Sequence, residues 1–227
     1  MLTVTFDAHD PALLAGFWAG LLGRKVVDGG LLPGDDTQLS LRFVAAESEK
    51  TRPNRIHLHV TSTSPADQQE KVATALALGA AHLDVGQLPE EGHIVLADPE
   101  GNEFCVIEPG NKFLAGCGLL GEIACDGTRA VGLFWSAATG WPLVWDQDEE
   151  TAIQSPRGGT KVAWGGPPLA PKEPRNRQRF ELTPTGGDRA AEVDRLIALG
   201  ATRLETDAAG TVLLADPDGN EFSVAGR

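Results

Sequence analysis

Two histidines with the spacing of a possible ligand pair, His57 and His59, stand in the segment 55–61. Apolar residues alternate with them, which predicts a strand with its apolar side chains on one face and both imidazoles on the other. Imidazoles on one strand face can bind a transition metal together with a carboxylate, or they can line a water-filled cavity. A two-residue histidine spacing is far less diagnostic than a helical HExxH pair, so the pattern favours the cavity.

Cys105 is the thiol best placed to be a nucleophile, because it lies on a predicted strand whose apolar residues face the other way. The sequence places no histidine beside it, and an unactivated thiol is mostly protonated at neutral pH. The pattern therefore favours a small filling residue, and Ser223 at the equivalent place agrees with that interpretation.

Charged residues on other predicted strands have two possible roles. Glu103 and Glu221 follow turns, where polar side chains usually satisfy local backbone groups, and we expect that role here. Arg179 suits either an anionic ligand or an ion pair with Glu181 or Glu221. In so acidic a chain we expect the ion pair.

One segment occurs twice in the chain, at 95–106 and at 213–224, and it contains several of these positions. Each copy reads strand, turn, strand, because Asp-Pro-acid-Gly is strong turn chemistry. Phe-Trp at 17–18 returns at 134–135 on a second predicted helix. The repeat predicts two similar halves. Each half is expected to contain two strand-helix-strand-strand-strand modules, with helices near 11–22, 65–78, 127–139 and 188–199, and with strands such as 25–28 and 38–45 between them.

Composition narrows the classes of partner. The chain has 227 residues, a net charge of −13 and a pI of about 4.7. So acidic a surface argues against nucleic acid and against anionic membranes. The first ten residues do not resemble a secretory signal, and no stretch reaches the ~20 apolar residues of a membrane span. Three cysteines without CxxC spacing indicate reduced thiols, so we expect a cytoplasmic protein.

Four ordered modules, the Leu-Gly-Ala helix ends at 78–80 and 199–201, and the Asp-Pro-x-Gly-Asn-Glu-Phe hairpin resemble the vicinal oxygen chelate superfamily. That superfamily includes glyoxalase I, extradiol dioxygenases, and bleomycin- and fosfomycin-resistance proteins. The glyoxalase-like branch is most similar, because its helices begin near Asp-Pro and carry Phe-Trp. The resemblance implies an α+β fold of two tandem glyoxalase-like domains, 1–110 and 114–227. Each domain would be a pair of βαβββ modules forming a cupped mixed sheet, with helices on the convex side and a ligand in the cup.

The resemblance also implies where a metal would bind: to His or Glu on the opening strand of a module and to Glu on its closing strand. The closing-strand position is Cys105 in one half and Ser223 in the other, so both halves lack that carboxylate. His57 is matched by Arg179, which cannot bind a cation. We therefore expect no metal cofactor. The alternative is a divalent metal such as Zn, Ni, Mn or Fe on His57, His59 and Glu103.

The favoured function is that of a glyoxalase- or bleomycin-resistance-like protein that binds a small molecule without the full metal site. The alternative is a metal-dependent lyase, isomerase or dioxygenase, with the metal acting as a Lewis acid. A third possibility is a purely structural half and one ligand site per chain. The expected assembly is a monomer with internal pseudo-symmetry or a homodimer. The expected cup residues are Thr5, Arg42, His57, His59, Glu103 and Cys105 in the first half, and Glu122, Trp164, Arg179, Glu181 and Glu221 in the second.

Overall fold

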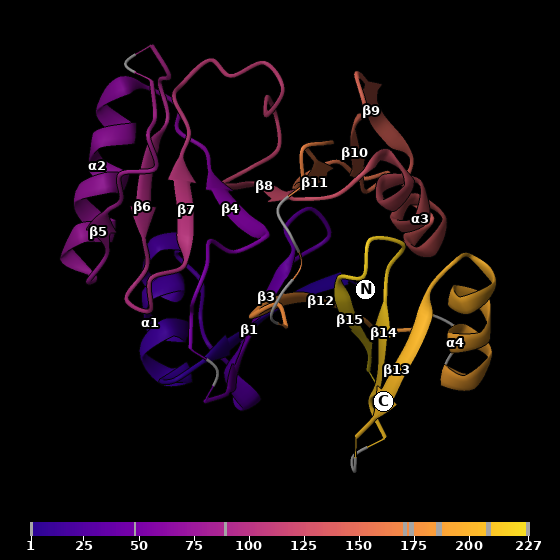
Figure 1. The fold of residues 1–227 in the computed structure, drawn as a ribbon. Coiled ribbons are helices and arrows are strands. Elements are labelled where there is room, and N and C mark those ends of the chain that lie inside the picture. Colours follow the sequence, from indigo (N-terminus) through magenta and orange to yellow (C-terminus); the bar gives the residue numbers. More distant parts are fainter. Residues whose placement is uncertain are drawn as a thin grey trace.

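A computed structural model of the chain describes residues 2–47, 49–88, 90–169, 172, 175–184, 188–207 and 210–225. The first half contains β1 (Leu2–Ala8), α1 (Pro11–Leu22), the 3-10 turn η1 (Asp28–Gly30), β2 (Leu31–Leu32), β3 (Ser40–Ala45), β4 (Ile56–Val60), α2 (Pro65–Ala77), β5 (Ala81–His82), β6 (Ile94–Ala97) and β7 (Glu103–Val106). The second half contains β8 (Leu120–Cys125), α3 (Arg129–Thr139), β9 (Leu143–Gln147), β10 (Glu150–Gln154), β11 (Lys161–Trp164), β12 (Gln178–Leu182), α4 (Arg189–Ala198), β13 (Thr202–Thr206), β14 (Val212–Ala215) and β15 (Glu221–Val224). Figure 1 shows both halves.

The α+β class and the four modules are confirmed, but one expected strand is wrong. Residues 25–28 form only an isolated bridge between Val27 and Leu31, followed by the 3-10 turn. Gly29 and Gly30 adopt φ of 72° and 67°, the left-handed region that glycine tolerates, and this turns the chain away from an extended path.

The modules pair across the two halves of the chain. A seven-stranded sheet runs β13-β14-β15-β12-β1-β3-β2, and an eight-stranded sheet runs β5-β6-β7-β4-β8-β11-β10-β9. We call these sheet A and sheet B. The joining contacts are antiparallel: β1 with β12, and β4 with β8.

This pairing differs from the expected order, in which neighbouring modules of one half share a sheet. β4 and β12 alternate in the same way, and β1 and β8 also contribute apolar residues to the core, so the apolar pattern is compatible with either pairing. Alternation therefore predicts the face of each strand but does not determine its partner. Each cup takes one module from each half.

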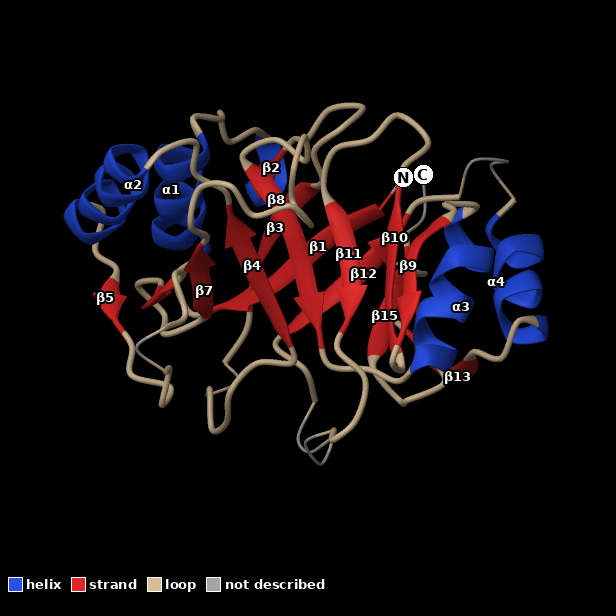
Figure 2. Cartoon of the chain, turned by 90° about the horizontal axis from the view of Figure 1, so that it is seen from above, coloured by secondary structure: helices blue, strands red, loops and turns tan. Residues whose placement is uncertain are grey.

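The helices cover the outer ends of the two sheets. Figure 2 shows α1 and α2 at one side and α3 and α4 at the other, with the strands between them. The Asp10 carboxylate caps α1 by accepting from two backbone amides, and Gly23 ends the helix in a left-handed conformation. Arg195 of α4 donates to the carbonyl oxygens of Ala137 and Ala138 in α3, which joins that helix pair.

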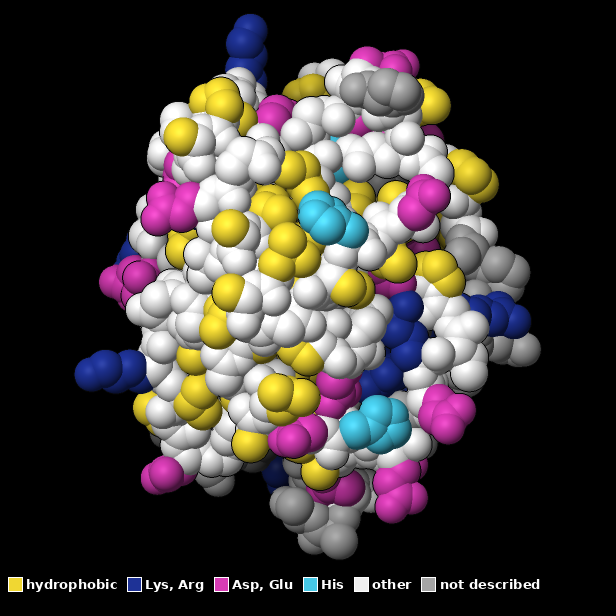
Figure 3. Space-filling view, turned by 90° about the vertical axis from the view of Figure 1, so that its left-hand side faces the viewer, with side chains coloured by type: hydrophobic (Ala, Val, Ile, Leu, Met, Phe, Trp, Pro, Cys, Tyr) yellow, Lys and Arg dark blue, Asp and Glu magenta, His cyan; other side chains and the backbone are white. Residues whose placement is uncertain are grey.

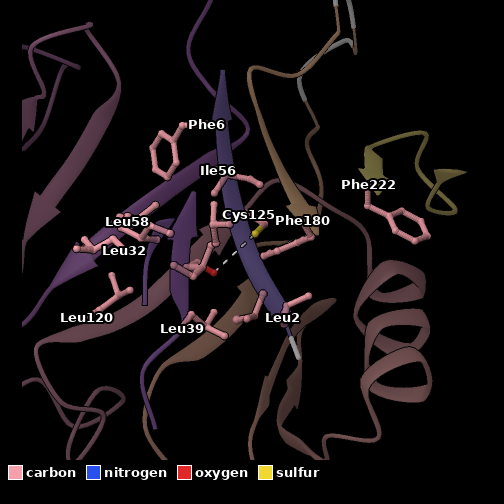
Figure 4. Packing of buried hydrophobic residues seen from close by; sticks show 14 of the residues in the cluster. Leu2, Phe6, Leu32, Leu39, Ile56, Leu58, Leu120, Cys125, Phe180 and Phe222 are labelled. Atoms are coloured by element: carbon pink, nitrogen blue, oxygen red, sulfur yellow. Dashed lines mark hydrogen bonds between the residues drawn. The ribbon is translucent and has the colours of Figure 1, made fainter. Parts of the chain in front are cut away.

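One large hydrophobic core lies between the helices and the convex faces of both sheets. Trp18 and Trp135 are each 1% exposed, as expected for core residues. Their rings meet Phe104 and Phe222 edge-on, at centroid distances of 5.1 and 4.9 Å. Figure 4 shows apolar side chains from β1, β4, β8 and β12 packed together, so residues from both halves share this core.

The outer face over α1 and α2 carries acidic side chains spread among apolar ones (Figure 3). This agrees with the acidic composition of the chain. Among the described residues, no helix is both long and apolar enough to cross a membrane.

Candidate functional site

The concave face of sheet B brings together three of the expected site residues. His59 on β4 is the register partner of Glu122 on β8 and of Cys105 on β7. The His59 Nδ1 atom lies 2.7 Å from Glu122 Oε2. Burial alone lowers the pKa of this imidazole, but interactions with Cys105 and Glu122 outweigh that effect and raise the pKa to about 10. His59 is therefore an imidazolium at neutral pH.

The position of Cys105 corrects a sequence-based expectation. The sequence placed no histidine beside this thiol, but the parallel pairing of β4 with β7 sets His59 directly next to it. Cys105 is partly buried, whereas Cys117 and Cys125 are buried. Cys105 is therefore the most accessible of the three thiols, and its neighbour across the strands is a positively charged imidazole.

His57 has the opposite electrostatic environment from His59. Burial is the largest influence on its pKa and lowers it from the ordinary value, so the imidazole is neutral at neutral pH. Its Nε2 atom is buried and has no hydrogen-bond partner among the described residues. Buried polar atoms are nearly always paired, so this nitrogen is available to a ligand.

A groove of about 800 Å³ opens on this side of sheet B. Its walls are aromatic: Phe113 and Trp145 meet edge-to-face at a centroid distance of 5.9 Å, and Trp145 is 38% exposed. The Lys161 ammonium lies 4.1 Å from the centre of the Phe113 ring. Its polar floor includes His57 and Glu122. Apolar walls with a few polar groups are typical of small-molecule sites.

Trp164, expected in the cup, has two roles. It is 2% exposed and belongs to the core, yet it also contributes to the wall of the groove. Sequence reasoning missed Phe113, which follows the linker between the halves, and Lys161, whose ammonium donates to the Phe113 carbonyl. Its position as an aromatic residue just after the linker was the sequence signal that could have identified Phe113.

Glu103 does not approach the histidines as a metal ligand would. It pairs with Lys50 and accepts from the backbone amide of Asn54 at 3.2 Å. Glu221 repeats this arrangement, pairing with Lys172 at 2.7 Å and accepting from the Asn176 amide at 3.3 Å. Both carboxylates brace the loop that leads into the opening strand of their module.

The metal-binding alternative does not fit these side chains. The Glu103 carboxylate is held by Lys50, and the His59 Nδ1 atom is held by Glu122. In the part of the chain that the structure describes, no group of three or more His, Cys, Asp or Glu side chains is placed to hold a metal ion.

The concave face of sheet A is occupied by ion pairs. The Arg179 Nη1 atom lies 2.5 Å from Asp7 Oδ1, and the Arg42 Nε atom lies 3.4 Å from Glu181 Oε1. The expected ion pair of Arg179 is therefore present, but its partner is Asp7 on β1 rather than Glu181 or Glu221. The reason is the cross-half pairing, which brings β1 and β12 together. Thr5 lies on the same strand, 3% exposed.

The same pairing redistributes the expected cup residues. His57, His59, Glu103, Cys105, Glu122 and Trp164 belong to sheet B, whereas Thr5, Arg42, Arg179, Glu181 and Glu221 belong to sheet A. The assignment of one cup to each half is therefore wrong.

The fold and this cup define an α+β protein of paired βαβββ modules, with a small-molecule-sized groove on the concave side of one sheet. The chain belongs to the glyoxalase-like domain family, whose profile matches residues 3–107 and again residues 122–225. No curated protein matches the sequence significantly.

Two solved structures illustrate the fold. Glyoxalase I from Zea mays is similar over 100% of this chain and 92% of its own, with a TM-score of 0.62 and 12% identity. A Bacillus subtilis protein proposed to be a dioxygenase is similar over 99% of this chain and 84% of its own, with a TM-score of 0.62 and 10% identity. At these identities the likeness concerns the fold alone.

Proposed function

We propose that this chain binds a small, largely apolar or planar molecule in the groove of sheet B. The observation that carries the proposal is the aromatic wall of Phe113 and Trp145 beside the buried, unpartnered His57 Nε2 atom. A planar ligand stacks on exposed aromatic rings, and a neutral imidazole nitrogen orients it through one hydrogen bond.

The proposal gives one ligand site per chain, in the cup of sheet B. In sheet A the charged side chains of the concave face pair with one another, Arg179 with Asp7 and Arg42 with Glu181. Opening that cup requires breaking partly buried ion pairs, which is costly. Sheet A then has a structural role, which agrees with the third of the sequence-based possibilities.

The test uses 1-naphthol as the probe and isothermal titration calorimetry as the measurement. The unmodified chain is expected to bind about one molecule per chain. Trp145→Ala removes one exposed wall and should weaken binding about fivefold, since an aromatic contact contributes roughly 1 kcal/mol. Leu204→Ala is the matched control, because Leu204 is also exposed, at 48%, but lies on β13 of sheet A. Equal affinities of the two variants would overturn the proposal.

The metal-dependent alternative has its own test. Elemental analysis of protein purified without a histidine tag, compared with the His57→Ala variant, measures bound metal directly. Stoichiometric metal that is lost in the variant would support the alternative. The pairing of Glu103 with Lys50 and of His59 with Glu122 leads us to expect no such metal.

A further inference from the structure

A second cavity, of about 240 Å³, lies between the loops that lead into β4 and β12. We call it the loop cleft. It is lined by residues 49–55 of the first half and by Lys172 and residues 175–178 of the second half, together with His57 and Asp126. The chain as a whole is strongly acidic, yet six of the eight Lys, Arg, Asp and Glu residues that line the cleft are basic, the other two being Glu49 and Asp126. The basic lining residues are Lys50, Arg52, Arg55, Lys172, Arg175 and Arg177.

The two halves contribute equivalent groups to the loop cleft. Lys50 pairs with Glu103, the first residue of β7, and Lys172 pairs with Glu221, the first residue of β15. The side-chain amide of Asn54 donates to Asn102 Oδ1 of the neighbouring hairpin at 2.9 Å, and that of Asn176 donates to Asn220 Oδ1 at 3.2 Å. Two copies of one loop therefore face each other, and the internal repeat places their positive charges around a common space.

Several of these cations are already neutralised. Lys50 and Lys172 have carboxylate partners, and Arg177 lies 2.9 Å from Glu100. Arg52 and Arg175 are exposed, and no carboxylate of the described residues forms an ion pair with either. These two guanidinium groups, one from each half, remain available to a ligand.

Buried polar atoms without partners are concentrated on the lining of the loop cleft. Gln178 is 2% exposed, and both its Nε2 and Oε1 atoms have no hydrogen-bond partner within the described residues. Among the same described residues, the Nε atom of Arg177 also has no hydrogen-bond partner, and the Nε atom of Arg55 makes no hydrogen bond, although it lies 3.7 Å from Asp126 Oδ2. Native proteins leave few buried polar atoms unsatisfied, so such a cluster indicates something that binds there.

Water hydrates both the buried atoms and the two exposed guanidinium groups, but it does not balance the positive charge that these groups bring to the cleft. An anion bonds to these groups and balances that charge, because guanidinium groups match the oxygens of a phosphate through paired, charge-assisted hydrogen bonds. We propose that the loop cleft binds a small phosphate-type anion, either free or as the terminal group of a phosphate monoester. The proposal does not depend on the groove of sheet B having a ligand.

The loop cleft and the groove are neighbours, since His57 and Asp126 line both. This gives a local reporter for anion binding. Phosphate in the loop cleft should shift the ring signals of His57, whereas the rings of His82 and His93, which do not line the loop cleft, should not respond.

The experiment titrates inorganic phosphate into the full chain at constant ionic strength, followed by calorimetry and by histidine ring signals in NMR. Saturable binding that shifts His57 is expected. Arg52→Ala and Arg175→Ala should each weaken binding about tenfold, through loss of hydrogen bonds to a charged group. Arg157→Ala is the matched control: its side chain is 66% exposed, it pairs with Asp36, and it removes the same charge elsewhere.

Three results would overturn the proposal. The first is the absence of saturable binding at millimolar phosphate. The second is a loss of affinity in Arg157→Ala equal to that in Arg52→Ala, which indicates non-specific attraction. The third is binding that leaves the His57 signals unchanged. A Gln178→Leu variant adds a check inside the loop cleft: if it folds and binds phosphate more weakly, the buried amide contributes to the site. Calorimetry with 1-naphthol is independent, so failure of one proposal leaves the other intact.

Discussion

The imidazole of His59 and the carboxylate of Glu122 lie 2.7 Å apart, although their residues belong to different halves of the chain. The contact exists because β4 pairs with β8, and it places a charged pair on the concave face of sheet B. This pair leads to the first prediction.

The first prediction concerns pH. Because the pKa of His59 is raised from 6.5 to about 10, the folded state binds this proton more tightly than the unfolded state. The resulting stabilisation is fully present below about pH 6.5 and is lost as the pH rises toward 10. Urea unfolding at several pH values should show this decline. Glu122→Gln should make it shallower, and an identical slope in the variant would contradict the assignment.

The second prediction concerns thiol reactivity. Cys105 is partly buried beside an imidazolium, whereas burial raises the pKa of Cys117 and of Cys125. Iodoacetamide at neutral pH should therefore modify Cys105 first, as measured by mass spectrometry of peptides. Modification of all three cysteines at one rate would contradict this order.

The third prediction concerns the ion pair in sheet A. The side chains of Arg179 and Asp7 are 11% and 9% exposed. Arg179→Met leaves the Asp7 carboxylate buried without its partner and should cost about 3 kcal/mol of unfolding free energy. The double variant Asp7→Leu with Arg179→Met should recover most of that loss, because neither charge remains. Denaturant unfolding measures both, and a double variant no more stable than the single one would refute the account.

The fourth prediction uses two adjacent glycines. Gly158 and Gly159 have φ of 82° and 89°, so alanine is strained at either position. A Cβ at Gly158 meets nothing within 4 Å, whereas a Cβ at Gly159 would lie 1.7 Å from the Thr37 carbonyl oxygen. Gly158→Ala should cost roughly 1–2 kcal/mol. Gly159→Ala should cost clearly more, because the backbone around Thr37 must move. Equal melting temperatures would contradict this.

The sequence was sufficient for the class of fold, because the repeated hairpin and the strand alternation depend on local chemistry. The core roles of Trp18 and Trp135 followed from helical spacing in the same way. The partner of each opening strand was not predictable, since β1 finds equivalent apolar faces on more than one strand. That one ambiguity explains why Asp7 was missed as the partner of Arg179.

The groove was predictable only in part for a related reason. Trp164 was expected in the cup, and it does line the groove together with Trp145. Phe113 lies outside any strand, so periodicity gave no information about its direction. The loop cleft was not foreseen, because its basic residues come from two loops that are far apart in the chain and meet only after the modules pair.

Because β1 is hydrogen-bonded to β12 and β4 to β8, neither half can be removed without opening both sheets. A fragment that ends before β8 would carry two bare edges, each shaped to accept an antiparallel strand. Two copies of that fragment could close each other by supplying the missing strands reciprocally. The fusion of the halves into one polypeptide thus makes an otherwise bimolecular assembly independent of concentration.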